Sequence, residues 1–334
     1  MAAGVAKKTP AAASWVRFAG SFIAALFAIF ALSFLFILVT DPFDRGHPVS
    51  LLPAGVLDEN PRTANVSRGH DPRFNAAIFG NSHVQLIDPD RLSGFTGFQF
   101  VQMSTPAAGS REQTALMQWF MRNHPSIRAM VVGIDDRWCE QDSALPLTHP
   151  FPFWLYGSDL NYFMRVVSTR SLEHGWRRLR IARDASPVTD PSGYWDYEQP
   201  GRWAARPPAP ADRPPVDLSP ASAPDMEFPA LDQLESVSAQ LPADTTIVLV
   251  MPPVYYTSLP AADSAEARQM AGCKYELLRR AAQRHWHFID FYSDTPLSHD
   301  PENFWDATHV RMNIARVMEM RIAEEVSQLS HIER

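Results

Sequence analysis

Three residues whose types could carry out acyl transfer lie at opposite ends of the 334-residue sequence. Ser82 follows the apolar run AAIF, after Gly80 and Asn81, whereas Asp306 and His309 lie in a polar stretch near the C-terminus. A nucleophilic serine needs a base that takes its proton and a third group that orients this base. Because Asp306 and His309 are three positions apart, the carboxylate could fix the imidazole while the other ring nitrogen faces Ser82. Taken alone, Ser82 fits an ordinary turn at a strand end better than a nucleophile, and it is Asp306 and His309 that favour the nucleophile.

A serine nucleophile also needs hydrogen-bond donors for the oxyanion that develops during attack. The backbone N–H of Ser82 is the first candidate, because Gly80 permits a sharp turn into a helix start. Gly109, after the second predicted strand and at a predicted helix N-terminus, is the second candidate. A third donor would follow the third predicted strand, but Asp135 at that place cannot donate from an ionised carboxylate.

Four more side chains lie near these positions and are candidates for substrate contact: Asn81, His83, Asp135 and Trp138. We expect His83 to pack in the first turn or to contact substrate rather than to act as the base. Trp138 either lines the site or is an ordinary loop residue. The sequence has no CxxC motif and no His/Cys cluster with metal-ligand spacing, so it predicts no metal site. Acyl transfer by a serine triad requires no organic cofactor, and none is predicted.

The elements that would position these residues indicate an α/β fold. Short apolar runs predict five strands, over 76–79, 98–102, 129–134, 246–251 and 287–291. Such runs suit parallel strands that are covered on both faces. Helices are predicted over 110–123, 264–284 and 312–329. Strands that alternate with helices imply a doubly wound parallel sheet, and ligands bind beyond the carboxyl ends of its strands, where Ser82 lies.

An uncharged apolar segment, Phe18–Val39, is long enough to cross a bilayer as a helix. It exceeds the apolar core of a cleaved signal peptide, so we expect a signal anchor rather than a buried core helix. Lys7, Lys8 and Arg17 precede it, and positive residues stay on the cytoplasmic side. The sequence therefore predicts a single-pass inner-membrane protein with four parts: cytoplasmic residues 1–17, a transmembrane anchor over 18–39, an extended connector over 40–73 and a periplasmic domain over 74–334.

A long insertion is predicted over 140–240, between the third and fourth strands. Its first part, HPFPFWLYGSDLNYF, is aromatic. This part forms either a packed cap subdomain, a lid over a site, or a surface that faces lipid headgroups. A loop over 204–230 follows, too rich in proline for a helix or a central strand, and we expect it to be mobile.

The cysteines bear on the redox compartment of the protein, and the net charge bears on its partners. Cys139 and Cys273 are the only two cysteines, and they could form one disulfide in an oxidising compartment or remain two buried thiols. The net charge of −7 and the lack of a basic run beyond residue 20 argue against nucleic acid as the partner.

The motif GNSH around Ser82, Gly109 and the motif DATH that ends at His309 together resemble the blocks of the SGNH (GDSL-type) hydrolase superfamily. The resemblance covers roughly 74–135 and 245–330. It implies a three-layer flavodoxin-like fold and a triad that acts on acyl esters: Ser82 as nucleophile, His309 as base and Asp306 as orienting acid, with the Ser82 and Gly109 amides as oxyanion donors.

The sequence departs from this pattern at two positions. Asn81 replaces the usual Asp of the first block, and the Asn of the third block has no clear match near Asp135. The layout is similar to that of membrane-anchored SGNH-like proteins of cell-envelope acylation, such as the lipoteichoic-acid D-alanylation protein and SGNH domains attached to polysaccharide O-acyltransferases.

The resemblance implies an esterase or acyltransferase for acyl esters of an envelope polysaccharide or glycolipid, working with an envelope acylation partner protein. The alternative is a non-catalytic accessory that binds a glycan in an export or modification complex. The missing third-block amide favours that alternative.

Overall fold

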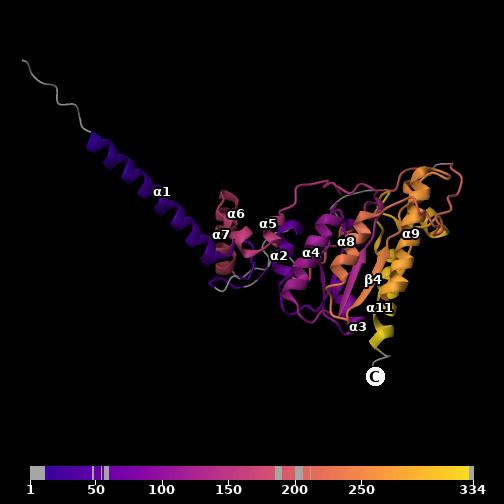
Figure 1. Ribbon diagram of the computed structural model, residues 1–334. Coiled ribbons are helices and arrows are strands. Elements are labelled where there is room, and N and C mark those ends of the chain that lie inside the picture. The colour runs from indigo at the N-terminus through magenta and orange to yellow at the C-terminus, as the bar shows by residue number, and fades with distance from the viewer. Residues whose placement is uncertain are drawn as a thin grey trace, which may run out of the picture.

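The computed structural model describes residues 12–46, 49–53, 55, 60–184, 190–199, 206–210 and 212–330. A long N-terminal helix, α1 (Ala12–Thr40), projects from an α/β domain that contains the rest of the described chain (Figure 1). Ser14–Thr40 is long and apolar enough to cross a membrane, as the sequence predicts.

Five parallel strands form one sheet in the order β2-β1-β3-β4-β5. Their bounds are β1 Ala76–Phe79, β2 Phe100–Gln102, β3 Ala129–Gly133, β4 Thr246–Met251 and β5 His287–Asp290. All five predicted strands are confirmed, although three of them are shorter than expected. β1 to β4 consist almost entirely of buried residues, which agrees with their continuous apolar sequences. Since β1 pairs with β2 and β3, the loops after these three strands meet at one edge of the sheet.

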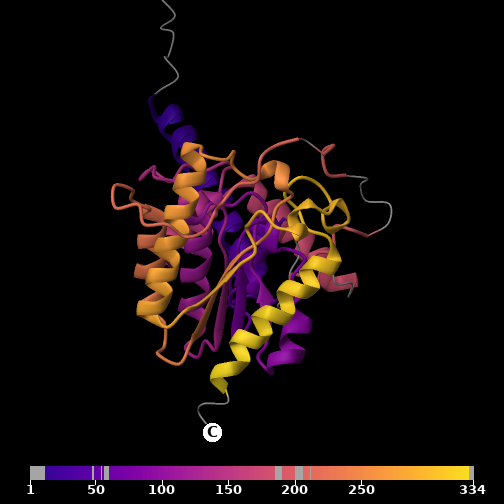
Figure 2. The ribbon, with the colours of Figure 1, turned by 90° about the vertical axis from the view of Figure 1, so that its right-hand side faces the viewer.

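Helices cover the sheet, and the three predicted helices are confirmed. α3 (Pro89–Thr96) packs against α11 (Met312–Ser330), and α4 (Ser110–Asn123) packs against α8 (Pro229–Ser238). α9 (Ala265–Arg284) contacts β5, and the short α10 (Pro296–His299) follows that strand. In Figure 2, α4 and α9 lie on one side of the strands, whereas α3 and α11 lie on the other.

The predicted extended connector over 40–73 is wrong for most of its described residues. Asp41 and Asp44 are buried at the end of α1, and α2 (Pro61–Arg68) lies inside the domain. Asn60 caps α2 and Pro61 occupies its first position, where the missing N–H has no cost. Asn65 in α2 donates from Nδ2 to the Met103 carbonyl at 2.8 Å. Residues 60–73 are therefore part of the fold rather than a tether.

Among the described residues, the insertion contains α8 and three further helices: α5 (Phe153–Tyr156), α6 (Asp159–Arg165) and α7 (Thr169–Asp184). The Pro-rich segment contains no helix or strand over the described residues 206–210 and 212–228, as predicted, but the expectation that it is mobile is not supported over 212–228. Val216 and Leu218 are buried there, and Arg213 donates to the carbonyls of Tyr256 and Leu259. Backbone without secondary structure is fixed here by side-chain burial and by one arginine.

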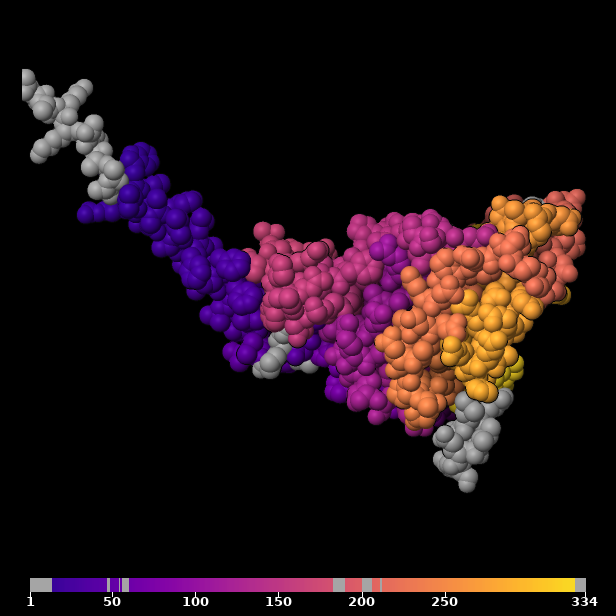
Figure 3. Space-filling view, viewed as in Figure 1, coloured from indigo at the N-terminus to yellow at the C-terminus, as the bar shows by residue number. Residues whose placement is uncertain are grey.

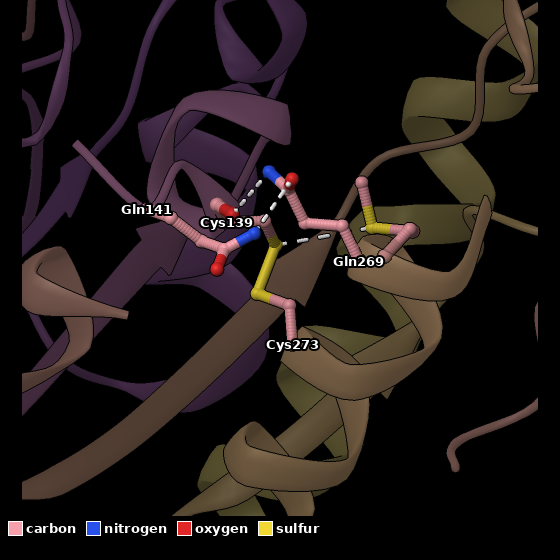
Figure 4. The surroundings of a disulfide bond; sticks show 5 residues. Cys139, Gln141, Gln269 and Cys273 are labelled. Atoms are coloured by element: carbon pink, nitrogen blue, oxygen red, sulfur yellow. Dashed lines mark hydrogen bonds between the residues drawn. A yellow bond between two sulfur atoms is a disulfide. The ribbon is translucent and has the colours of Figure 1, made fainter. Parts of the chain in front are cut away.

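Cys139 and Cys273 form a disulfide, so of the two alternatives left open by the sequence, the structure has the disulfide and not two free thiols. Their Cα atoms are 5.4 Å apart, and the bond joins the segment after β3 to α9 (Figure 4). Gln269 donates to the Cys139 carbonyl at 2.8 Å and accepts from Gln141 at 3.1 Å. The bond fixes the 3₁₀ helix η2 (Asp136–Cys139), which follows Asp135 directly.

Candidate active site

The structure brings Ser82, His309 and Asp306 into one hydrogen-bonded chain. Ser82 Oγ lies 2.8 Å from His309 Nε2. On the other side of the ring, His309 Nδ1 lies 2.8 Å from Asp306 Oδ2 and 2.9 Å from Oδ1. This geometry suits transfer of a proton from the hydroxyl to the imidazole while the carboxylate holds the ring.

The turn after β1 presents Ser82 at the carboxyl edge of the sheet. Ser82 begins the 3₁₀ helix η1 (Ser82–Val84), and Asn81 caps this helix by accepting from the His83 N–H at 2.9 Å. Gly80 has a φ of +156°, and a Cβ added there would overlap Val84 Cγ2. Glycine is therefore needed at position 80 so that Val84 can pack beneath the turn.

The loop that carries Asp306 and His309 is shaped by its own aspartate. Asp306 Oδ1 accepts from the backbone N–H groups of Thr308 and His309, both at 2.8 Å. The Tyr255 N–H, just beyond β4, donates to the Ala307 carbonyl at 3.0 Å and ties the loop to the sheet. Burial alone would raise the pKa of Asp306, but the hydrogen bonds from His309 and Thr308 lower it to about 2. Asp306 is thus an anion throughout the neutral range.

One of the two expected oxyanion donors is open and the other is occupied. The Ser82 N–H has no hydrogen-bond acceptor among the described residues. The Gly109 N–H instead donates to Glu112 Oε2 at 2.9 Å, so the assignment of Gly109 as an oxyanion donor is not supported. Glu112 is completely buried, and burial raises the pKa of its carboxyl group. Gly109 is the N-cap of α4 and Glu112 is the third helical residue, so the Glu112 carboxylate reaches back to the Gly109 N–H.

Asn81 and Asp135 support the turn instead of lining an open site. Asn81 Nδ2 donates to Asp135 Oδ2, and both residues are buried. Asp135 Oδ1 is enclosed and has no partner within the described part of the chain. Burial, reinforced by the charge of Asp136, raises the pKa of Asp135 to about 8, so this acid is neutral at pH 7. Direct substrate contact by Asn81 and Asp135 is therefore not supported.

Trp138 and His83 have different surroundings. Trp138 is completely buried, so the prediction that it lines the site is wrong. His83 is partly exposed, and its ring lies edge-on to that of His309 with centroids 5.4 Å apart. Burial and the neighbouring His309 lower the pKa of His83 to about 4, so it is neutral at pH 7. Substrate contact through His83 stays a prediction.

Tyr197, from the insertion, packs over the loop that carries Asp306 and His309 and was not anticipated from the sequence. Its hydroxyl donates to the Val310 carbonyl at 2.7 Å, and its ring lies 5.8 Å from that of His309. The next residue, Glu198, binds Arg311 at 2.8 Å. No local pattern marks Tyr197, because its role depends on a contact with a loop more than a hundred residues away. Within the residues that the structure describes, no cluster of His, Cys, Asp or Glu is arranged to hold a metal ion.

The sequence matches no family model and no curated protein. A solved structure described as BT4096, a gut microbial diltiazem-metabolizing enzyme, is similar with a TM-score of 0.38 and 10% sequence identity. The similarity covers 77% of this chain and 47% of the other, so the chain spans about half the length of that protein. A likeness at this level carries no conclusion about family or function.

Proposed function

We propose that the protein is a membrane-anchored, extracytoplasmic serine esterase or acyltransferase of the SGNH type. Its substrate would be an acyl ester on an envelope polysaccharide or glycolipid. The observation that carries the proposal is the chain of hydrogen bonds from Ser82 through His309 to Asp306. The strand order 2-1-3-4-5, which flavodoxin-like sheets share, and the position of Ser82 beyond the end of β1 support it.

In the proposed reaction, Ser82 Oγ attacks the acyl carbonyl carbon while its proton passes to His309 Nε2. The Ser82 N–H stabilises the oxyanion, and Asp306 stabilises the imidazolium. When the tetrahedral intermediate collapses, the ester C–O bond breaks and the leaving sugar oxygen takes the proton from His309. Water or an acceptor hydroxyl then attacks the acyl-serine, with the same proton transfers in reverse order, and frees Ser82.

A fluorophosphonate probe tests the nucleophile, because it forms a covalent bond only with an activated serine. We expect the full-length protein in detergent to be labelled, Ser82→Ala to be unlabelled, and the exposed-site variant Ser219→Ala to be labelled like the wild type. Equal labelling of Ser82→Ala and the wild type would refute the assignment.

The alternative function is a non-catalytic accessory that binds an acylated glycan. It is favoured by one observation: the Gly109 N–H is occupied by Glu112, which leaves Ser82 as the only expected donor that is open. The accessory would be recognised by a folded protein that neither reacts with the probe nor hydrolyses p-nitrophenyl acetate. Its glycan binding would be unchanged in Ser82→Ala.

A further inference from the structure

α7 packs against the last turns of α1, and α6 lies beside them (Figures 1 and 3). The rings of Phe34 in α1 and Phe163 in α6 lie 6.0 Å apart. α7 approaches α1 closely at Gly175, where an added Cβ would lie 2.5 Å from Thr40 Oγ1 and 2.8 Å from a ring carbon of Phe36. The contact therefore involves the end of the apolar run itself, not a linker beyond it.

Two buried arginines, Arg45 and Arg178, fix the end of α1 to the domain; we call this contact the Arg45 and Arg178 joint. Arg45, just after α1, donates to the carbonyls of Leu155 at 3.0 Å and Gly157 at 2.7 Å. Arg178 in α7 donates to Asp44 at 3.1 Å and to the Pro53 carbonyl at 2.6 Å. Only 4% of the Arg45 side chain and 2% of the Arg178 side chain are exposed. The domain is thus held in one position relative to α1.

The residues of α1 that contact no other part of the domain indicate where α6 and α7 would lie relative to a membrane. Every residue over 14–32 is exposed, and contact begins at Ser33. These 19 bare residues extend about 28 Å at ~1.5 Å per residue. The hydrocarbon core of a bilayer is about 30 Å thick. If these bare residues cross the bilayer, a segment shifted a few residues toward the N-terminus from the predicted span 18–39, then α6 and α7 begin where the helix leaves the hydrocarbon.

Exposed apolar side chains surround this point. Outside α1, the described residues include nine large hydrophobic side chains that are exposed, and five of them lie around the end of α1: Val49, Leu51, Leu160, Met164 and Trp176. The Leu51 N–H donates to the Val39 carbonyl at 3.0 Å, which turns residues 49–51 back toward the helix end. We call these five side chains the collar.

Basic side chains accompany the collar. Four exposed arginines on or between α6 and α7 have no carboxylate within ion-pair distance among the described residues: Arg165, Arg170, Arg177 and Arg180. On α7, Trp176, Arg177 and Arg180 share the face that points away from the buried Gly175 and Arg178. Tryptophan and arginine together are favoured where apolar lipid meets charged headgroups.

We propose that the collar is a membrane-contact surface, whose apolar side chains enter the boundary between acyl chains and headgroups while the four arginines bind anionic lipid headgroups. The proposal rests on α1 spanning a bilayer but not on the chemistry of Ser82. Amphipathic elements of this composition bind in the interfacial plane through apolar burial and attraction to anionic lipids. Through the Arg45 and Arg178 joint, the contact would hold the domain at one height and orientation above the membrane.

Nitroxide labels on the full-length protein in vesicles test the depth of the collar. Met164→Cys labels α6, and Met320→Cys, an exposed methionine of α11, is the matched control. The native cysteines form the disulfide and do not react with the label. In phosphatidylcholine vesicles with phosphatidylglycerol, we expect the label at 164 to be accessible to oxygen and shielded from a water-soluble nickel complex, with the opposite result at 320. Equal nickel accessibility at 164 and 320 would overturn the proposal.

Vesicles that differ in lipid charge test whether the arginines bind anionic headgroups. In the Met164→Cys background, Arg177→Gln/Arg180→Gln should shift the label toward water in phosphatidylglycerol-containing vesicles. Arg279→Gln/Arg284→Gln on α9 removes the same charge elsewhere and should leave the depth unchanged. A label depth that is the same in neutral and anionic vesicles, or that responds equally to both double variants, would refute binding of anionic headgroups by these arginines.

Discussion

His309 Nε2 lies 2.8 Å from Ser82 Oγ, although 227 positions separate the two residues in the sequence. β1, which presents Ser82, lies between β2 and β3 in the sheet, whereas the His309 loop follows β5 at its edge. The loop reaches Ser82 because the Tyr255 N–H near β4 holds its Ala307 carbonyl. The Ser82–His309 hydrogen bond therefore forms only when the whole sheet is assembled.

Asp306→Asn should lower kcat for hydrolysis of an acyl ester by about 10⁴-fold, the size of the loss when the orienting carboxylate of a serine triad becomes an amide. The carboxylate of Asp306 accepts from His309 Nδ1, whereas an amide can offer a donor there and favour the wrong tautomer. The measurement is ester hydrolysis with the rate of probe labelling at Ser82. Asp300→Asn, which alters only a helix cap in the same region, is the control and should retain the wild-type rate. A loss below tenfold in Asp306→Asn would contradict a triad.

Asp135→Asn should change how stability depends on pH. The pKa of Asp135 is raised from 3.8 to about 8, so between these values the folded protein keeps a proton that the unfolded chain releases. The free energy of unfolding of the wild type therefore falls as pH rises from about 4 to 8, by up to about 1.4 kcal/mol per pH unit from this group. The amide that Asp135→Asn introduces can still accept from Asn81 but does not titrate.

Urea unfolding of the detergent-solubilised protein from pH 4 to 8 measures this difference. The free energy of unfolding of Asp135→Asn minus that of the wild type should increase as pH rises. Asp225→Asn, at an exposed position, should follow the wild type. Parallel curves for the wild type and Asp135→Asn would show that Asp135 is ionised in the folded protein.

The sequence predicted the sheet and the candidate nucleophile, base and acid because each has a local signal. The buried strands are continuous apolar runs, and Ser82, Asp306 and His309 are chemically distinctive residues next to strand or helix ends. The sequence placed Gly109 at a helix N-terminus but did not predict that the N–H of Gly109 is occupied. With Gly109 as the cap, Glu112 occupies the third helical position, from which a carboxylate reaches the cap N–H.

Other features depend on distant contacts that have no local pattern. The segment 60–73 has the composition of a linker, but Asn65 and Val66 are buried against the domain. Trp138 lies next to the site in the sequence, yet its large apolar ring is more stable in the core. Tyr197 belongs to an insertion whose position over His309 only the folded structure reveals.

Replacing both cysteines, in Cys139→Ala/Cys273→Ala, should lower the free energy of unfolding by about 2–5 kcal/mol. The bond closes a loop between residues 134 positions apart, so its loss allows the unfolded chain more conformations. Urea unfolding of the two proteins in detergent checks the magnitude. Both cysteines are almost completely buried, so the folded wild type should resist a reductant that acts quickly in urea. Rapid reduction of the folded protein would show that η2 opens from α9.

Tyr197→Phe tests whether the insertion positions the base. The hydroxyl of Tyr197 donates to the Val310 carbonyl, and burial raises the pKa of this phenol above its ordinary value, so it remains a donor throughout the neutral range. Removing it leaves a carbonyl next to His309 unpaired, at a cost of about 1–3 kcal/mol. We expect a lower kcat for ester hydrolysis with little change in KM, because the substitution removes only the hydroxyl that aligns the His309 loop and leaves Ser82 and its turn unchanged.

The control for Tyr197→Phe lies three residues away on the same segment. Tyr194 donates its hydroxyl to the Met312 sulfur at 3.7 Å, a weaker contact that does not adjoin His309. Tyr194→Phe should therefore leave kcat unchanged, and a probe-labelling rate at Ser82 that falls only in Tyr197→Phe would place the effect at the base. An equal loss of activity in both variants would mean that the segment 190–199 contributes general stability and does not align His309.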